Sequence, residues 1–599
     1  MLRRKFIVVL TIVLFLASLT IPIKASPAEF RIGGGWPLPP GYHGNPFGPG
    51  GVGAAYWFMY EPLFYYLPGN DSLIPRLATS YEITDNGRVL VVHLREGVLW
   101  HDEKPFTSED VKTTWYIIGA LYGVTWWRYI DSIETPDPLT VIFRLTTISP
   151  LVRLRILVEP IRAPKHIFGD LMADADSLLK IRKEIWAYEA RGEKAPEELR
   201  DRLSKMLADF REKIYAIKPG VPTVPGTGPY MVVRVTESEI TLKKFPKHYM
   251  AATTLIDTVR IFRWTNNEVM WGYLLGGEID AGHPASPPDV NRAILDRWKG
   301  KMGYALPSDY SIFALLFNLE DPLVKDYALR KAIAHVIDKK KVREVCYYFG
   351  LNYEKYAPIV LKSIYDKWLP EDVLAKFTSY EYDPKKAEEI LTAAGYTKGP
   401  DGLWRTPEGK VIEIEVQTNA PYSDWVLAAD EIARELSAFG FKAVARPIPS
   451  EIFWPGLDAK NYRVAFAWGP AAWPGHPLEG AYRLFTVGGE LQRRTGFDPL
   501  KTYDTPWGPA VPAKLVDELL TTTDPERQKE IVQILSYIAN EELPLIPIVE
   551  KRIGIYYLDG VRVTGWPPED DPSWTLTPGG IERFYVLLLS KGILRPVAG

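Results

Sequence analysis

Apolar and polar residues alternate with a period of two in several short segments of the chain. Residues 81–84 alternate in this way, residues 89–94 (VLVVHL) are mostly apolar, and Asp85, Asn86 and Gly87 stand between the two segments. An Asn-Gly pair favours a tight hairpin because both central residues tolerate positive φ. We therefore predict a β-hairpin here. Further strands are predicted at 138–146, 230–235, 240–243, 258–262, 311–318, 411–418 and 543–549.

Other segments repeat their apolar residues at helical spacing. One begins at Thr107, where Asp110 three residues later completes the pattern of a capping box. Residues 172–215 contain two such segments, separated by the Gly- and Pro-containing stretch 192–196, and predict a charged helical hairpin. We interpret this hairpin as a solvated surface insert, with a docking site for a membrane partner as the alternative. Further helices are predicted at 265–275, 325–348, 384–395, 423–438 and 525–540.

The order of these elements indicates the fold class. Strands and helices alternate along the chain without an internal repeat, which is typical of an α/β fold. Residues 31–55 are rich in Gly and Pro and are predicted to be irregular loop, not a phosphate-binding cradle. The Pro/Gly segment 221–228 is predicted to cross between subdomains.

Composition excludes several classes of protein. The chain has 599 residues, of which 46% are hydrophobic and 24% charged, so it is neither disordered nor a polytopic membrane protein. Its 71 basic and 74 acidic side chains leave no positive field for nucleic acid, and its single cysteine rules out an internal disulfide framework. The 51 prolines and scarce Gln and Cys indicate either adaptation to high temperature or genomic bias.

The N-terminus has the pattern of an export signal. Basic residues at 3–5 precede an apolar run at 6–23, and Ala25 follows, so residues 1–25 are predicted to be a signal peptide. The run is about 18 residues and a membrane span needs about 20, so an uncleaved anchor is the alternative. The sole cysteine is Cys346, far from the cleavage site, so we do not expect a lipoprotein. The protein is expected outside the cytoplasmic membrane.

Common catalytic and cofactor motifs are absent from the sequence. It contains no GxxxxGK[ST], GxSxG or HExxH pattern, and no GxGxxG that follows a predicted strand into a helix. Its eight histidines include no pair at metal-ligand spacing. We therefore expect no cofactor, no metal and no catalysis, and we interpret Cys346 as a core residue. A secreted glycosidase is the alternative from another class, because it needs only two carboxylates about 5–9.5 Å apart in one cleft. A chemosensory or scaffold protein binding the same ligand is a third.

Residues 75–111 (PRLATSYEITDNGRVLVVHLREGVLWHDEKPFTSEDV) closely resemble the signature of the oligopeptide/dipeptide-type (family 5) solute-binding proteins of ABC importers. The resemblance continues, in the order typical of the family, at 226–230 (GTGPY), 277–281, 317–319, 329–338, 387–396 and 542–547.

The resemblance implies a two-lobed, periplasmic-binding-protein-like α/β fold of type II, in its large three-subdomain form, with the ligand cleft between the lobes. It implies a monomer that passes a small solute to permease subunits, with ATP hydrolysis performed by other chains and no role for nucleic acid. The implied division is subdomain I of lobe 1 at 28–72, 218–307 and 546–599, subdomain II at 73–217 with the insert 172–215, and lobe 2 at 308–545.

One departure from the family pattern concerns the ligand. Peptide binders of this family usually carry an Asp in a Trp-rich loop that neutralises the ammonium group of the peptide. The matching loop here is 468–477 (WGPAAWPGHP), with alanines where the Asp is expected. An enclosed ammonium group without a counter-charge is costly. We therefore expect a neutral oligosaccharide, with an oligopeptide as the alternative and nickel complexes or opines less favoured.

Aromatic side chains are the candidate contacts for such a ligand, because Trp and Tyr offer an apolar face together with a polar group. Each could equally be a packing residue. The aromatic candidates are Trp57, Tyr60, Trp126, Trp127, Trp264, Trp454, Trp468 and Trp473. Glu61 and Asn419 are the polar candidates, being near predicted lobe edges.

Overall fold

The structure is a computed structural model. It describes residues 28–39, 41–48, 51–191, 193–471, 476–576 and 580–598. The predicted signal peptide and Trp473 lie outside these residues. Within them, no helix is both long and apolar enough to cross a bilayer.

The first lobe is built on a seven-stranded sheet in the order β12-β21-β11-β1-β10-β9-β8. Its strands are β1 Glu29–Gly34, β8 Tyr230–Val235, β9 Glu239–Lys244, β10 Thr258–Arg263, β11 Ala281–Gly282, β12 Met302–Ala305 and β21 Ile555–Leu558. The prediction of irregular loop from residue 31 is wrong for 31–34, which belong to β1. A Cβ at Gly33 would lie 2.0 Å from Met270 Cε, so a larger residue in this strand would displace the end of the Met270 side chain.

The same lobe contains a four-stranded sheet in the order β4-β5-β7-β6. Its strands are β4 Ala78–Thr84, β5 Val89–Leu94, β6 Ile130–Asp137 and β7 Thr140–Leu145. The predicted hairpin is confirmed, since β4 and β5 pair antiparallel across a turn in which Asp85 and Asn86 have positive φ. The predicted capping box is also confirmed, with Thr107 and Asp110 at the start of α2 (Ser108–Tyr122).

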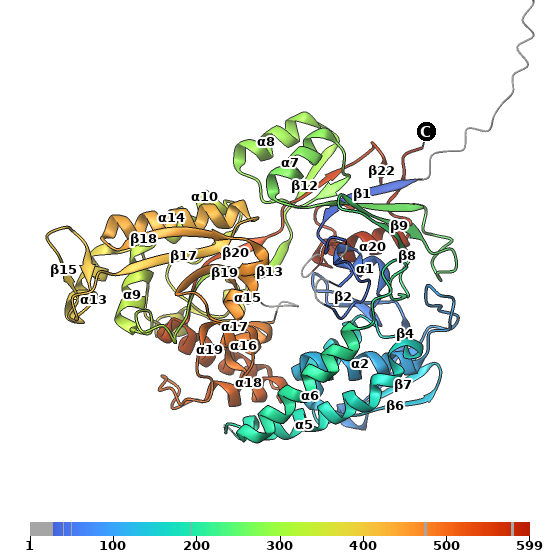
Figure 1. The fold of residues 1–599 in the computed structure, drawn as a ribbon, viewed down its shortest axis with the longest axis horizontal. Helices are drawn as coiled ribbons and strands as arrows, with labels where there is room; N and C mark the ends of the chain where they lie inside the picture. Colours follow the sequence, from blue (N-terminus) through green and yellow to red (C-terminus); the bar gives the residue numbers. More distant parts are fainter. Residues whose placement is uncertain are drawn as a thin grey trace, which may run out of the picture.

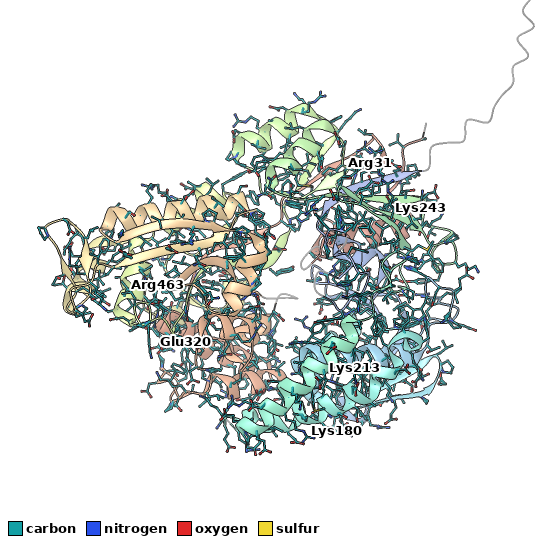
Figure 2. All side chains as sticks on the ribbon, in the orientation of Figure 1. Arg31, Lys180, Lys213, Lys243, Glu320 and Arg463 are labelled. Carbon is teal, nitrogen blue, oxygen red and sulfur yellow. The ribbon has the colours of Figure 1, made fainter. Side chains whose placement is uncertain are left out.

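The predicted helical hairpin is present as α5 (Met172–Ala190) and α6 (Glu197–Tyr215). Both helices contact α2. Lys180 and Lys213, labelled in Figure 2, lie on these two helices, and Lys213 Nζ pairs with Asp174 Oδ2 at 2.6 Å, joining α6 to α5. The hairpin is therefore fixed to the four-stranded part of the first lobe.

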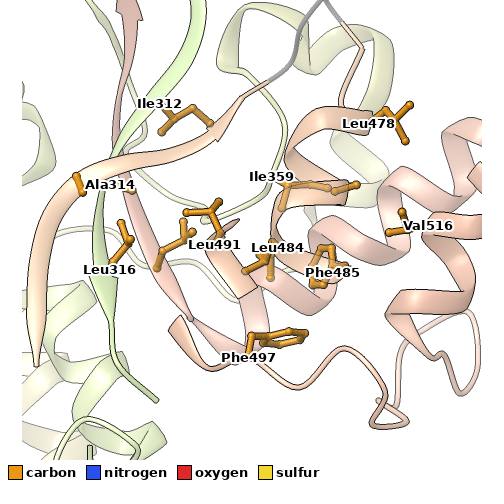
Figure 3. Packing of buried hydrophobic residues seen from close by; sticks show 14 of the residues in the cluster. Ile312, Ala314, Leu316, Ile359, Leu478, Leu484, Phe485, Leu491, Phe497 and Val516 are labelled. Carbon is orange, nitrogen blue, oxygen red and sulfur yellow. The ribbon is translucent and has the colours of Figure 1, made fainter. Parts of the chain in front are cut away.

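The second lobe is built on a six-stranded sheet in the order β14-β20-β13-β19-β17-β18. Its strands are β13 Ser308–Phe317, β14 Leu351–Asn352, β17 Glu413–Asn419, β18 Lys442–Ile448, β19 Val464–Ala471 and β20 Leu545–Arg552. Central β13 sends Ile312, Ala314 and Leu316 into a core shared with Leu484 of α16 (Leu478–Phe485) and Val516 of α18 (Pro512–Thr521) (Figure 3).

One predicted helix of this lobe is wrong in its extent. Residues 325–348 form two helices, α9 (Tyr327–Val336) and α10 (Lys339–Cys346). Asp338 ends the continuity because its side chain accepts a hydrogen bond from Lys341 N and so caps a new helix.

Two segments cross between the lobes. One joins β12 to β13 and the other joins β20 to β21, and they are hydrogen-bonded to each other from Ile553 N to Pro307 O at 2.9 Å. The sheet order places β20 in the second lobe, so this crossing lies after Arg552. Figure 1 shows the two lobes on either side of these segments. The fold is a two-lobed α/β architecture, which confirms the predicted fold class.

Candidate ligand site between the lobes

A cavity of about 590 Å³ lies between the two lobes, next to the crossing segments. Ten lining residues come from the first lobe: Gly33, Gly34, Gly35, Arg263, Trp264, Thr265, Asn267, His283, Ala285 and Glu582. Ten come from the second: Phe313, Tyr347, Pro421, Tyr422, Asp424, Trp425, Ser450, Glu451, Trp468 and Lys551. Because both lobes contribute to its wall, the cavity depends on their being close together.

On the first-lobe side, the wall is formed where β1 and β10 end. Trp264 follows β10 directly, and its amide donates a hydrogen bond to Gly34 O at 2.8 Å. Its half-buried ring lies edge-on to His283, with ring centroids 4.9 Å apart. The indole N–H has no hydrogen-bond partner among the residues that the structure describes. Trp264 thus provides an aromatic surface beside the cavity, while its unpartnered indole N–H is itself buried.

On the second-lobe side, the wall is an aromatic cluster. Trp468 on β19 has its ring centroid 5.1 Å from that of Phe313 and 5.2 Å from that of Trp425. Lys551 Nζ lies 4.8 Å from the centroid of the same ring. These neighbours hold Trp468 in one orientation and leave only part of its ring exposed to a ligand.

The ionisable groups of the wall carry less charge than their number indicates. Burial raises the pKa of Asp424 to about 6 and that of Glu582 to about 7. Burial likewise lowers the pKa of His283 to about 3, which keeps the imidazole neutral. Lys551 is paired with Asp309, Nζ to Oδ2 at 2.9 Å. Arg263 and Glu451 also line the cavity, so the wall offers donors, acceptors and charges of both signs.

A second cavity of about 650 Å³ adjoins the first, between α7 (Asn267–Gly276), α8 (Pro288–Arg297) and the start of α14 (Ser423–Phe439). Its lining includes the apolar residues Trp271, Val345, Cys346, Val426 and Leu427. Six residues line both cavities: Thr265, Ala285, Pro421, Asp424, Ser450 and Glu451. Asn267 Nδ2 joins the lobes between them, donating to Ser423 Oγ at 3.0 Å and Asp424 Oδ1 at 3.3 Å. Asp424 therefore stands where the two cavities meet.

Two of the predicted contacts, Trp264 and Trp468, line the first cavity. A third, Asn419, is fully buried at the end of β17 and does not reach it. Its Oδ1 accepts a hydrogen bond from Ser450 Oγ at 2.8 Å, and Ser450 lines both cavities. Asn419 therefore acts on the site only by orienting Ser450.

Glu61 and Tyr60 require correction, because both side chains are fully buried away from the cleft. Glu61 Oε1 accepts a hydrogen bond from Arg76 Nε at 2.8 Å and another from the Tyr249 hydroxyl at 2.9 Å, and His248 lies 3.2 Å from Oε2. The Tyr60 hydroxyl donates to Val224 O at 2.8 Å. These residues hold the first lobe together and have no surface to offer a ligand.

The described lining of the two cavities does not include Trp57, Trp126, Trp127 or Trp454. Trp127 is buried in the core of the first lobe. Arg583 lies over the Trp57 ring, 4.6 Å from its centroid. Trp454 packs against Trp425, with centroids 6.0 Å apart, so it supports the wall from behind. Trp126 contacts the second lobe elsewhere, as described below.

Several lining residues were not predicted from the sequence, notably Tyr422, Asp424, Trp425, Lys551 and Glu582. A signal existed for the first three, which follow β17 in a strand–turn–helix segment. In open α/β sheets, ligands bind beyond the carboxyl ends of strands. Lys551 and Glu582 belong to β20 and α20 (Glu582–Ser590), where no motif distinguishes them. The described residues contain no group of three or more His, Cys, Asp or Glu placed to hold a metal ion.

Comparisons with known proteins agree with this architecture. Residues 72–490 match the family described as bacterial extracellular solute-binding proteins, family 5 Middle. A putative ABC transporter peptide-binding protein of Brucella suis is 25% identical over 456 residues, 74% of each protein. The dipeptide-binding protein of Escherichia coli is 24% identical over 378 residues, 58% of this chain and 60% of that one.

Two solved structures show the same fold. A periplasmic oligopeptide-binding protein of Thermotoga maritima, solved with bound mannohexaose, has a TM-score of 0.76 at 21% identity, covering 96% of this chain and 99% of that one. An oligopeptide-binding protein of Bacillus subtilis, in complex with a nonapeptide, has a TM-score of 0.70 at 15% identity, covering 96% and 100%. The chain therefore belongs to family 5 of the bacterial extracellular solute-binding proteins, the solute-binding components of ABC importers.

Proposed function

We propose that this protein encloses a neutral oligosaccharide between its lobes by hinge closure and delivers it to the permease subunits of an ABC importer. It would act as a monomer outside the cytoplasmic membrane after export directed by residues 1–25, and it would perform no chemical step. The observation that carries the proposal is the wall of the first cavity, where aromatic rings from both lobes stand beside carboxyl groups whose pKa values are raised by burial.

The chemistry of this wall suits a sugar. Pyranose rings have apolar C–H faces that pack on aromatic rings, and their hydroxyl groups need both donors and acceptors. Trp264 and Trp468 supply ring surfaces on opposite lobes. Glu582, with a pKa of about 7, can donate as an acid or accept as a carboxylate near neutral pH, whereas Asp424, with a pKa of about 6, mainly accepts. A neutral polyol needs no counter-charge, and Lys551 already has one in Asp309.

Two further facts support the proposal. The Trp-rich loop beginning at Trp468 has alanines where peptide binders of the family usually have an Asp. The Thermotoga protein, which shares the fold, holds mannohexaose in its crystal structure.

An oligopeptide is the second candidate, and a specific observation favours it as well. Relatives of this chain are named peptide- and dipeptide-binding proteins. The carboxyl groups of Asp424 and Glu582 have raised pKa values because burial is not fully compensated by nearby positive charge. The α-ammonium group of a peptide could provide that charge.

Calorimetric titration with mannohexaose and with tetra-alanine distinguishes the two candidates. The chain lacking residues 1–25 should first be unfolded and refolded, to remove any ligand carried through purification. We expect saturable binding of mannohexaose that Trp264→Ala weakens about fivefold or more, since a stacked ring contributes roughly 1 kcal/mol or more. Trp57→Ala is the matched control, because Trp57 is also half-buried but lies outside both cavities. Binding of tetra-alanine with no response to mannohexaose would contradict the proposal.

A further inference from the structure

The lobes also touch on the side of the molecule opposite the crossing segments. Figure 1 shows α5, in the helical hairpin of the first lobe, next to α18 of the second lobe at the bottom of the view, and these two helices are in contact. Two shorter elements of the first lobe contribute to this junction, η3 (Thr125–Tyr129) and α3 (Pro150–Val158). The described lining of either ligand cavity includes no residue of these four elements.

Arg128 is the centre of the junction. Its guanidinium crosses to the second lobe, where Nη1 lies 2.6 Å from Asp517 Oδ1 of α18. The Tyr129 hydroxyl donates to the same oxygen at 3.2 Å. Within the first lobe, Arg128 Nη2 lies 2.8 Å from Glu189 Oε2 of α5, and the ring of Trp186 lies 5.5 Å from the guanidinium carbon. The Arg128 side chain is only 9% exposed, so this pair is shielded from salt more than a surface pair is.

A second set of contacts joins the lobes beside the first. Arg155 of α3 forms an ion pair with Glu479 of α16. The guanidinium of Arg155 also lies over the ring of Trp126, 4.8 Å from its centroid. Trp126 in turn contacts Tyr482, with ring centroids 5.9 Å apart. Trp126, one of the predicted ligand contacts, is thus part of the contact between the lobes.

We propose that the ion pairs of Arg128 with Asp517 and of Arg155 with Glu479 form a latch. This latch holds the two lobes together independently of ligand, and the α5–α6 hairpin supports it. Separation of the lobes breaks the pairs of Arg128 with Asp517 and of Arg155 with Glu479. Glu189 stays with Arg128 in either arrangement, because both belong to the first lobe. A buried guanidinium without a partner is costly, so Glu189 keeps the open arrangement accessible and makes the latch reversible.

The latch has a consequence for transport that holds for any ligand class. A ligand enclosed between the lobes leaves only when they separate, so the stability of the latch contributes to the dissociation rate. The inference therefore does not depend on the proposed oligosaccharide, and it can be tested without ligand.

Small-angle X-ray scattering of the ligand-free chain lacking residues 1–25 tests the latch, at about 50 mM and about 1 M NaCl. The test variant combines Asp517→Asn with Glu479→Gln. It removes the two negative charges that the second lobe contributes to the latch and leaves Arg128 paired with Glu189. The control is Glu518→Gln, the next residue of α18. Its carboxylate pairs with Arg527 within the second lobe, Oε1 to Nε at 2.6 Å.

We expect wild type and Glu518→Gln to scatter as the closed structure does at low salt and to stay mostly closed at high salt, because the Arg128 pair is shielded from salt. The double variant should be expanded at low salt, with a closed-to-open ratio reduced about tenfold or more. Three results would overturn the proposal: a wild-type chain that is already open at low salt, a double variant that scatters like wild type, or an equal expansion of the Glu518→Gln control.

Discussion

Glu61 and Asp424 are both buried acidic residues. Glu61 lies in the interior of the first lobe and Asp424 in the wall of the cleft, and their surroundings shift the pKa of the carboxyl group in opposite directions. Burial disfavours ionisation of Glu61, but Arg76 and His248 outweigh it and lower its pKa to about 2. Burial of Asp424 is not outweighed by Lys551, and its pKa rises to about 6. Glu61 is thus a fixed anion, whereas Asp424 changes charge near physiological pH.

This difference separates a structural acid from a candidate binding acid. An anion whose hydrogen bonds and charge are all satisfied within the protein has nothing left for a ligand. A carboxyl group that the fold leaves partly uncompensated, beside a cavity, is typical of functional sites. Both residues are buried, so the decisive property is the set of partners and not the depth of burial.

The largest effect on stability is expected from breaking the ion pair between Arg76 and Glu61. Arg76→Met leaves the Glu61 carboxylate buried with only His248 and Tyr249, and we expect it to lower the free energy of unfolding by about 3–5 kcal/mol near neutral pH. Urea unfolding followed by fluorescence measures this change. A loss below about 1 kcal/mol would contradict the account of Glu61 as a structural anion.

Removing the carboxyl charge of Asp424 should raise the free energy of unfolding, the opposite of the effect of Arg76→Met. Asp424 has a pKa of about 6 in the folded chain against an ordinary value of 3.8, so the folded state holds its proton more tightly than the unfolded state. Its stabilising contribution is full below pH 3.8 and is lost as the pH rises to about 6. Asp424→Asn should therefore raise stability by about 3 kcal/mol at about pH 8 and leave it unchanged near pH 3.5.

Thermal or urea unfolding at the two pH values tests this prediction. The neighbouring Glu451→Gln is the control, because Glu451 also lines both cavities but is exposed. Destabilisation by Asp424→Asn at the higher pH would show that the ionised carboxylate is paired in the folded chain and would remove the contrast with Glu61.

The smallest effect concerns the neutral polar groups beside Asp424. Ser450→Ala removes the hydroxyl that Asn419 orients at the junction of the cavities. We expect the dissociation constant for mannohexaose to rise about three- to tenfold, the equivalent of one hydrogen bond. Ser437→Ala, on the exposed side of α14 where the hydroxyl bonds Ala443 O, is the control. An unchanged affinity would place the ligand away from this junction.

Turns and helix caps could be predicted from the sequence where the residues that form them are neighbours in the chain. The turn at Asp85 and Asn86 and the capping box at Thr107 depend on residues a few positions apart, and both are confirmed. The strand character of Gly33 was missed because its cause is distant. Gly33 pairs with Phe262 of β10, far along the chain, and glycine alone in the sequence indicates a loop.

The candidate site shows the same limit. Glu61 was predicted as a ligand contact because it lies near a lobe edge in sequence, but its role is decided by Arg76, His248 and Tyr249, the last two about 190 residues away in the chain. Asn419 was predicted and Asp424, five residues later, was not, because only the packed helix shows which side chain faces the cavity. The family resemblance indicated that the ligand site is a cleft between the lobes. Which side chains line it, and which are already paired within a lobe, could be seen only in the structure.

The central claim is that the cleft acids serve a neutral ligand, and proton exchange on binding tests it most directly. Titrations at about pH 6.5 in two buffers of different ionisation heat give the number of protons exchanged. A neutral sugar adds no charge: its desolvation of Asp424 raises the pKa of that group and a hydroxyl bonded to the carboxylate lowers it, so mannohexaose should bind with a small net proton exchange. Binding of tetra-alanine with proton release that is abolished in Asp424→Asn, together with no response to mannohexaose, would contradict the account, because an ammonium group beside Asp424 lowers the pKa of its carboxyl group.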